Sequence, residues 1–205
     1  RSNPITGEIL KEEPHVKWHA RDKLQEADWN TGRRIITSNG MGTGLVFSYS
    51  NLTTGQKAAL ENNSSAVDYI RGKEVSGFRS REKKLGDIVH SAPLLVVKDG
   101  KDNDGDSLVD EPGEVSGTIF AGGNDGMLHA FNAETGVERF AYIPHLVFDH
   151  LMNLTDIDYQ HRFYVDATPY AKALYFAAGD MSHDGIDNDN DGTIDALDSN
   201  GSGTP

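Results

Sequence analysis

The segment from Gly117 to Pro144 constrains the fold of this chain more than any other stretch. It reads GTIFAGGNDGMLHAFNAETGVERFAYIP and contains three short runs rich in β-branched, aromatic and alternating residues. Asn124-Asp125-Gly126 indicates a hairpin turn between the first two runs, because these residues tolerate positive φ angles. Glu134-Thr135-Gly136 indicates a second turn. The segment therefore predicts an antiparallel meander, which is most of one β-propeller blade. Its expected strands are Thr118–Gly122, Met127–Ala133 and Val137–Ile143.

Weaker patterns predict elements on both sides of this meander. Thr53 or Thr54 is a suitable cap for a short helix through Leu60, and Ser64–Ile70 has a helical pattern. Trp18–Ala27 fits either a strand or a short helix. A helical turn is expected within His145–Asp158, and further strands are expected at Arg33–Thr37, Leu45–Tyr49, Asp87–Val97, Arg162–Val165 and Ala173–Ala178.

Acidic residues are concentrated in two short windows. The 205-residue chain has a formal net charge of −13. Residues 99–114 contain seven acidic side chains and one lysine, and residues 180–198 contain seven acidic side chains and no base. These windows account for the whole net charge, so the acidity requires a local explanation.

The second window predicts a calcium-binding loop. Oxygen-bearing residues recur at alternate positions, as in the EF-hand loop, where a hard cation is surrounded by oxygen ligands. Gly192 occupies the position of the sharp turn, and the aliphatic Ile194 follows at the expected place. The predicted ligands are Asp187, Asp189, Asp191, Thr193 through its carbonyl, Asp195 and Asp198.

The first window has the same register but fits less well. Ser107 replaces the turn glycine and Gly113 replaces the final acidic ligand, so Glu111 or Glu114 would complete the shell. The alternative for both windows is a solvated acidic linker without metal. Alternating carboxylates repel one another strongly, which favours calcium. The predicted ligands here are Asp102, Asp104, Asp106, Leu108 through its carbonyl, Asp110 and Glu111.

Other chemistry has little support in the sequence. There is no cysteine, which excludes thiol chemistry and disulfides. No motif of a serine hydrolase, zinc protease or phosphate-binding loop is present, and no apolar run reaches the roughly 20 residues of a membrane span. No enzymatic activity is therefore expected. Packing or surface roles are favoured for His145, Asp149 and His150, and core or edge roles for His90 and His129 on their predicted strands. A solvated face or internal ion pairs are favoured for Arg79, Arg81, Lys83 and Lys84.

Several separated motifs carry a family resemblance. The blade pattern resembles the repeat of quinoprotein-type β-propellers. Tyr69–Gly72 (YIRG), Phe78–Arg81 (FRSR), Leu85–Pro93 (LGDIVHSAP) and Val165–Pro169 (VDATP) accompany it in order. Together, over residues 33–169, they resemble the C-terminal propeller of PilY-type (also called PilC) type IV pilus biogenesis and tip-adhesin proteins. The resemblance also implies an EF-hand-like calcium site, usually located elsewhere in that propeller.

The expected fold is therefore all-β: part of a quinoprotein-like β-propeller, with short helices and two inserted EF-hand-like calcium loops. Residues 1–30 are expected to form an N-terminal extension and residues 31–205 a partial propeller with calcium-loop insertions at 99–114 and 184–198. Because a propeller needs about four blades or more and one is evident, the chain is expected to be a fragment of a longer protein or one member of a split propeller that another chain completes.

The expected function is that of a non-enzymatic, calcium-binding part of a type IV pilus tip adhesin, outside the cell. By resemblance, its partners are pilins or minor pilins at the tip and a host or abiotic surface, with neither nucleic acid nor membrane span. One alternative is a fragment of a quinoprotein dehydrogenase that binds pyrroloquinoline quinone, although Phe140 stands where a Trp is typical of the repeat. Another is a structural subunit of an extracellular filament.

Overall fold

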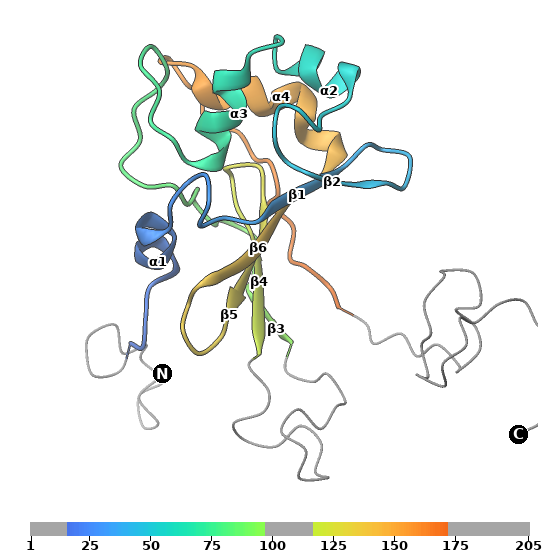
Figure 1. The fold of residues 1–205 in the computed structure, drawn as a ribbon. Helices are drawn as coiled ribbons and strands as arrows, with labels where there is room; N and C mark the ends of the chain where they lie inside the picture. Colours follow the sequence, from blue (N-terminus) through green and yellow to red (C-terminus); the bar gives the residue numbers. More distant parts are fainter. Residues whose placement is uncertain (1–15, 97–116, 172–205) are drawn as a thin grey trace, which may run out of the picture. The chain divides into compact units, whose positions relative to one another are not determined.

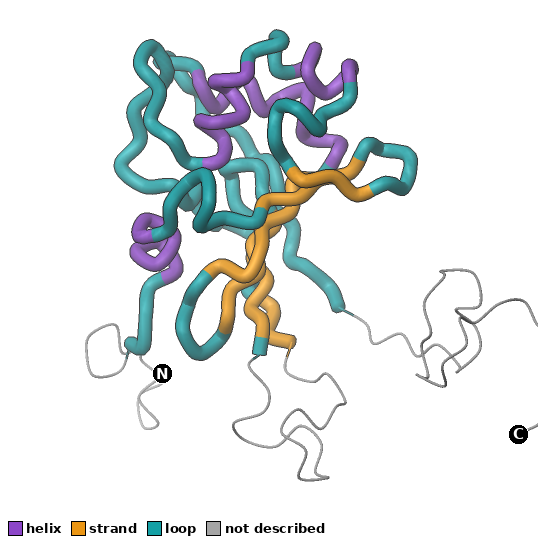
Figure 2. The backbone as a smooth tube through the Cα atoms, viewed as in Figure 1, coloured by secondary structure: helices purple, strands orange, loops and turns teal. Residues whose placement is uncertain are grey.

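The structure is a computed structural model that describes residues 16–96 and 117–171 (Figure 1). Short strands and short helices are joined by irregular segments throughout these ranges (Figure 2). The described elements are, in chain order, α1 (Ala20–Glu26), β1 (Ile35–Ser38), β2 (Gly44–Val46), α2 (Thr54–Ala59), α3 (Ser64–Arg71), β3 (Leu94–Val96), β4 (Thr118–Gly122), β5 (Leu128–Asn132), β6 (Glu138–Ile143), η1 (His145–Val147), α4 (Phe148–Leu151) and η2 (Met152–Thr155).

The predicted meander is confirmed. β4, β5 and β6 are consecutive antiparallel neighbours, and Gly122 pairs with Leu128 across the first hairpin. The Gly123 amide donates to the Met127 carbonyl at 2.8 Å, which closes the turn between β4 and β5. Gly126 lies in this turn with a φ of 91°, a conformation that residues with a Cβ atom rarely adopt. The glycine at this position is thus required by the turn.

The sheet continues beyond the meander, and the all-β propeller expectation is wrong. β1 lies parallel to the outer side of β6, and β2 is antiparallel to β1. β3 adds to the other side, antiparallel to β4. One mixed six-stranded sheet results, in the order β2-β1-β6-β5-β4-β3, with β2 and β3 as its edges. The described residues therefore form a single open sheet, whereas propeller blades are separate four-stranded antiparallel sheets.

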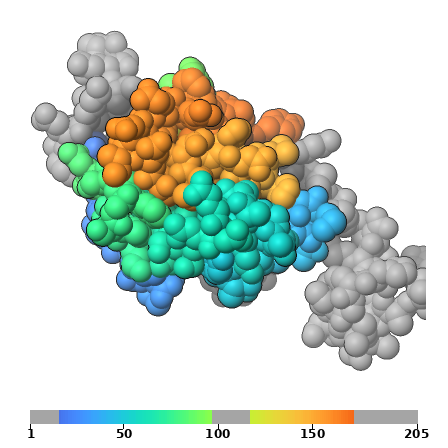
Figure 3. Space-filling view, turned by 90° about the horizontal axis from the view of Figure 1, so that it is seen from above, coloured from blue at the N-terminus to red at the C-terminus, as the bar shows by residue number. Residues whose placement is uncertain are grey.

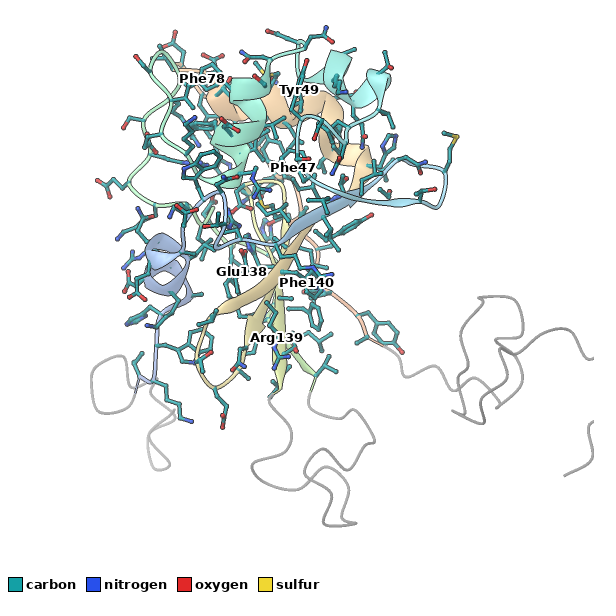
Figure 4. All side chains as sticks on the ribbon, viewed as in Figure 1. Phe47, Tyr49, Phe78, Glu138, Arg139 and Phe140 are labelled. Atoms are coloured by element: carbon teal, nitrogen blue, oxygen red, sulfur yellow. The ribbon has the colours of Figure 1, made fainter. Side chains whose placement is uncertain are left out.

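Helices cover the β1 and β2 end of this sheet, which makes the described fold mixed α/β. α2, α3 and α4 lie together at that end (Figure 1), and Figure 3 shows α2 and α3 side by side with the segment that contains α4. Phe47, labelled in Figure 4, is fully buried between the helices and the strands. The apolar core is Ile35, Phe47, Leu52, Leu60, Val67, Tyr69, Ile70, Met127, Ala141, Ile143, Phe148, Leu151 and Leu154.

Two helices begin where the sequence predicts. The Thr53 hydroxyl accepts a hydrogen bond from the Gln56 amide at 3.2 Å, and the Gln56 side chain accepts one from the Thr53 amide at 3.0 Å. This reciprocal pair caps the first turn of α2. The Asn63 side chain caps α3 through a backbone hydrogen bond of 3.0 Å. The segment Trp18–Ala27, which the sequence left open between strand and helix, contains the helix α1.

Two expected strands differ from the structure. Of Asp87–Val97, only the last part forms a strand, β3, which starts directly after Pro93. Arg162–Val165 forms no strand. The strand expected at Ala173–Ala178 and both acidic windows lie outside the described residues. Among the helices of the described ranges, none is long and apolar enough to cross a membrane.

Candidate functional site

The twelve predicted calcium ligands all lie outside the described residues, so calcium binding stays a prediction. Within residues 16–96 and 117–171, no three His, Asp or Glu side chains are grouped so that they could hold a metal ion. The densest group of interacting charged side chains in this part of the chain surrounds the turn Gly123–Met127, here called the β4–β5 turn.

His129 is the centre of a buried ion network. Its side chain, on β5, has no exposed surface. Nδ1 lies 2.8 Å from Oε1 of Glu138, which Figure 4 labels on β6, and Nε2 lies 3.1 Å from Oδ2 of Asp125 in the β4–β5 turn. Arg33 binds both Glu138 oxygens, through Nε at 2.8 Å and Nη2 at 2.9 Å. Four charged side chains thus compensate one another inside the protein.

Backbone groups satisfy further polar atoms of this network. The Gly86 amide donates to Oδ2 of Asp125 at 2.8 Å. Nη1 of Arg33 donates to the carbonyl of Arg71, the last residue of α3, at 2.8 Å. Arg71 is itself buried and donates to the Phe47 carbonyl at 2.8 Å. The network therefore joins the sheet to α3 and to two connecting segments.

The network holds its members in their charged forms. Burial alone would raise the pKa of Asp125, but the charge and hydrogen bonds of His129 outweigh it and lower that pKa to about 2. Burial would likewise raise the pKa of Glu138, but hydrogen bonds from His129 and Arg33 lower it to about 2. Burial would lower the pKa of His129, whereas its two carboxylate partners raise it to about 9.

This arrangement suits a structural role better than a catalytic one. A general base has to accept a proton from a substrate, and its pKa should lie near the working pH. Both ring nitrogens of His129 are engaged by carboxylates, and the ring is sealed from solvent. The network therefore fixes the position of the β4–β5 turn.

A second set of contacts joins Leu85–Pro93 to the same turn. The Asn124 amide donates to the Asp87 carbonyl at 3.0 Å, and the Asn124 side chain donates to the Asp87 carboxylate at 3.1 Å. The Ser91 hydroxyl accepts from the Gly122 amide at 2.8 Å. Asp87 and Ser91 therefore bond to the turn region and to side chains and not to a neighbouring strand. This explains why only the end of the expected strand Asp87–Val97 forms a strand, β3.

The segment Tyr159–Thr168, here called the strap, also lies against the β4–β5 turn. The Tyr164 amide donates to the Asn124 side chain at 3.1 Å, and the Val165 amide donates to the Gly123 carbonyl at 3.4 Å. A β-strand needs a regular series of backbone-to-backbone hydrogen bonds. The strap lacks such a series here, because the acceptor for the Tyr164 amide is the Asn124 side chain. The strap is therefore held by individual contacts to the turn.

Contacts of two exposed histidines join the strap to the segment Leu85–Pro93. His161 lies 2.8 Å from the Asp87 carboxylate, and His90 is hydrogen-bonded to Asp166. Phe163 packs against both rings, with ring centroids 5.1 Å from His161 and 5.2 Å from His90. His90 was expected on a strand; it lies before β3 instead and is exposed.

The remaining predicted histidines have surface positions, as the sequence indicated. The exposed His145 ring lies 6.0 Å from the Phe148 ring, and the exposed His150 accepts a hydrogen bond from Tyr164 through its carbonyl at 3.1 Å. Asp149 is exposed as well. The buried network, in contrast, was missed from the sequence. The available signal was the presence of His129 and Glu138 within otherwise apolar strand patterns.

Comparisons with known proteins agree with the resemblance of the motifs. The chain is 37% identical over 172 residues to the type IV pilus biogenesis factor PilY1 of Pseudomonas aeruginosa strain UCBPP-PA14, covering 70% of this chain and 15% of that protein. It is 33% identical over 193 residues to PilY1 of strain PAK, covering 78% and 16%. A PilY1 homolog of Xylella fastidiosa is 33% identical over 168 residues, covering 72% and 14%.

No protein-family model and no solved structure matches the chain. The chain covers only 14–16% of the length of the three PilY1 relatives.

The buried network predicts how stability depends on pH. The contribution of His129 is complete below its ordinary pKa of 6.5 and is lost as the pH rises through about 9. The contributions of Asp125 and Glu138 are complete above their ordinary values of 3.8 and 4.5 and are lost as the pH falls toward about 2. We expect the free energy of unfolding, measured by denaturant titration, to be highest between about pH 4.5 and 6.5.

The same measurements on His129→Gln should give a loss of about 3–5 kcal/mol at pH 6, because Asp125 then loses its hydrogen-bonded cation and Glu138 keeps only Arg33. The alkaline decline should become shallower. His19→Gln is the matched control, since His19 is exposed. An alkaline decline of equal slope in both variants would contradict the assignment of that decline to His129.

The strap contact predicts the effect of a single methyl group. A Cβ atom on Gly122 would lie 2.2 Å from the Val165 carbonyl oxygen, whereas a Cβ atom on Gly44, in strand β2, would have no neighbour within 4 Å. We expect Gly122→Ala to lower the melting temperature and to speed proteolysis within the strap, and Gly44→Ala to do neither. Unchanged cleavage of the strap in Gly122→Ala would show that this contact does not hold it.

The sequence motifs and the relatives together identify the chain as a distant homologue of part of the PilY1 type IV pilus biogenesis factors.

Proposed function

We propose that this chain acts in type IV pilus biogenesis as part of a PilY1-like factor. The observation that carries the proposal is its 37% identity to a part of PilY1. The contacts of the described residues support it, because two motifs of the family resemblance contact the β4–β5 turn and a third binds the ion network beside it. Arg71 of Tyr69–Gly72 binds Arg33 of the ion network, and Leu85–Pro93 and Val165–Pro169 contact the β4–β5 turn or each other.

The partners and location follow from this role as further proposals. A biogenesis factor acts where pilins assemble, so pilins or minor pilins at the pilus tip are the proposed partners, together with a host or abiotic surface. The proposed location is the cell surface or the pilus tip. The described part would contribute a scaffold, because its densest charged group is buried and structural rather than open to a substrate.

We also propose that the two acidic windows bind calcium. Their alternating carboxylates supply the oxygen ligands that calcium prefers, and they hold the whole net charge of −13. Without a cation these carboxylates repel one another at short range. Bound calcium would offset that repulsion and would stabilise the folded chain by mass action. Control of pilus extension and retraction by calcium is the regulatory role proposed for these windows.

One genetic experiment tests the function and the metal together. The gene that encodes this chain would be deleted in its host and replaced by the wild-type gene or by Asp187→Ala with Asp189→Ala. We expect deletion to reduce surface pili severalfold, wild type to restore them, and the double variant to restore fewer. Pili would be counted by electron microscopy of whole cells, and calcium binding of the purified chain measured by isothermal titration.

Asp156→Ala with Asp158→Ala is the matched control, because these exposed aspartates have the same spacing outside the acidic windows. The control should bind calcium and restore pili as wild type does. A deletion that leaves the number of surface pili unchanged would refute the role in pilus biogenesis. Calcium binding unaltered by the Asp187 and Asp189 substitutions would refute the proposed ligands and leave the pilus role to stand separately.

A further inference from the structure

A pocket of about 290 Å³ lies beside the β4–β5 turn. Residues 79–87 form much of its lining, with Asn124 and Asp125 of the turn and Tyr159 of the strap. In a chain with a net charge of −13, this lining is unusually rich in cationic side chains. They are Arg79, Arg81, Lys83 and Lys84, all half-buried.

Aromatic rings hold both arginines in fixed orientations. The Arg79 guanidinium lies 3.9 Å from the centre of the Tyr159 ring, and the Arg81 guanidinium lies 4.1 Å from the centre of the Tyr69 ring. Stacking on a ring occupies the flat face of a guanidinium and leaves its in-plane N–H groups for hydrogen bonds. Both groups are thereby oriented before any ligand arrives, which reduces the entropy lost on binding.

The N–H groups of these arginines are only partly used by the described part of the chain. The Arg79 side chain donates one hydrogen bond there, from Nε to the Tyr69 hydroxyl at 3.5 Å, so its terminal nitrogens are open to a ligand within the described part. Arg81 donates to the Tyr69 carbonyl, while its buried Nε has no hydrogen-bond partner among these residues. Among the described residues, the nearest carboxylate to that Nε, on Glu74, is 3.8 Å away. A guanidinium has five N–H donors, so both retain unused capacity.

Lys84 adds positive charge without a carboxylate partner in the described ranges. Its ammonium group donates to the backbone carbonyls of Gln25, at 2.9 Å, and Ala27. Burial and then the nearby charge of Arg33 lower the pKa of Lys84, and the charge of Asp28 offsets this only in part.

The acidic residues of the lining do not balance these cations. Asp125 is compensated by His129 within the buried network. Asp87 accepts hydrogen bonds from His161 and from Asn124. Glu82 is the remaining carboxylate of the lining and is exposed. The pocket therefore has a surplus of positive charge and of oriented donors.

We propose that this pocket binds a small oxyanion, either a phosphate or a carboxylate group. The Arg79 guanidinium is the main contact, and the Ser80 hydroxyl and Arg81 supply further donors. Planar guanidinium groups pair with both kinds of oxyanion through two parallel hydrogen bonds. The volume of the pocket, about 290 Å³, is sufficient for such a group. This site is independent of the proposed calcium loops and of the pilus role.

Isothermal titration of the whole chain with inorganic phosphate, and separately with citrate, tests the proposal at ionic strength held constant with sodium chloride. We expect saturable binding of at least one anion. Saturation by phosphate alone, by citrate alone or by both identifies the class of oxyanion. Arg79→Gln should weaken binding about tenfold or more, since it removes charge-assisted hydrogen bonds. Arg79→Lys should weaken it less, because the charge remains.

Lys57→Gln is the matched control, because Lys57 also packs on a tyrosine ring, at 5.3 Å from Tyr49, but lies outside this pocket. Its anion affinity should equal that of wild type. If Arg79→Gln does not fold, Ser80→Ala provides the second test, since the Ser80 hydroxyl is a proposed donor and the residue is exposed. No saturable binding of either anion, or equal affinity in the pocket variants and wild type, would overturn the proposal.

Discussion

Four charges buried together, on Arg33, Asp125, His129 and Glu138, are the constraint on which the rest of this structure depends. Each charge alone would be costly to remove from water. In the network each has an oppositely charged partner within hydrogen-bond distance, so this cost is offset only when all four are in place. The four residues come from the segment before β1, the β4–β5 turn, β5 and β6. Their pairing therefore requires these parts of the sheet to lie next to one another.

The fixed turn gives a physical reason for the pattern of motifs on which the family resemblance rests. Asp87 and Ser91 bind the turn region from one segment, and Val165 binds it from the strap. The basic pocket lies beside the same turn. Residues far apart in the sequence therefore depend on one local geometry, which explains how a few short motifs can mark this fold.

Local signals predicted local structure well, and failed where distant segments decide the outcome. The Asn124-Asp125-Gly126 turn and the cap at Thr53 follow from backbone preferences, so both were predictable. The parallel pairing of β1 with β6 depends on segments about a hundred residues apart, so one blade pattern wrongly predicted a propeller. The ion network was missed because spacing in the sequence does not show that Arg33 meets Glu138. Contacts to the turn likewise replaced the first part of the strand expected at Asp87–Val97 and the strand expected at Arg162–Val165.

The protonation state of His129 tests this account most directly. Nuclear magnetic resonance of the chain labelled with ¹⁵N in its histidines would follow both ring nitrogens as the pH is raised. The network predicts a ring protonated on Nδ1 and Nε2 at pH 7, with both N–H protons protected from exchange, which loses its proton only near pH 9. A neutral His129 ring at pH 7, titrating near its ordinary value of 6.5, would contradict the buried charge network.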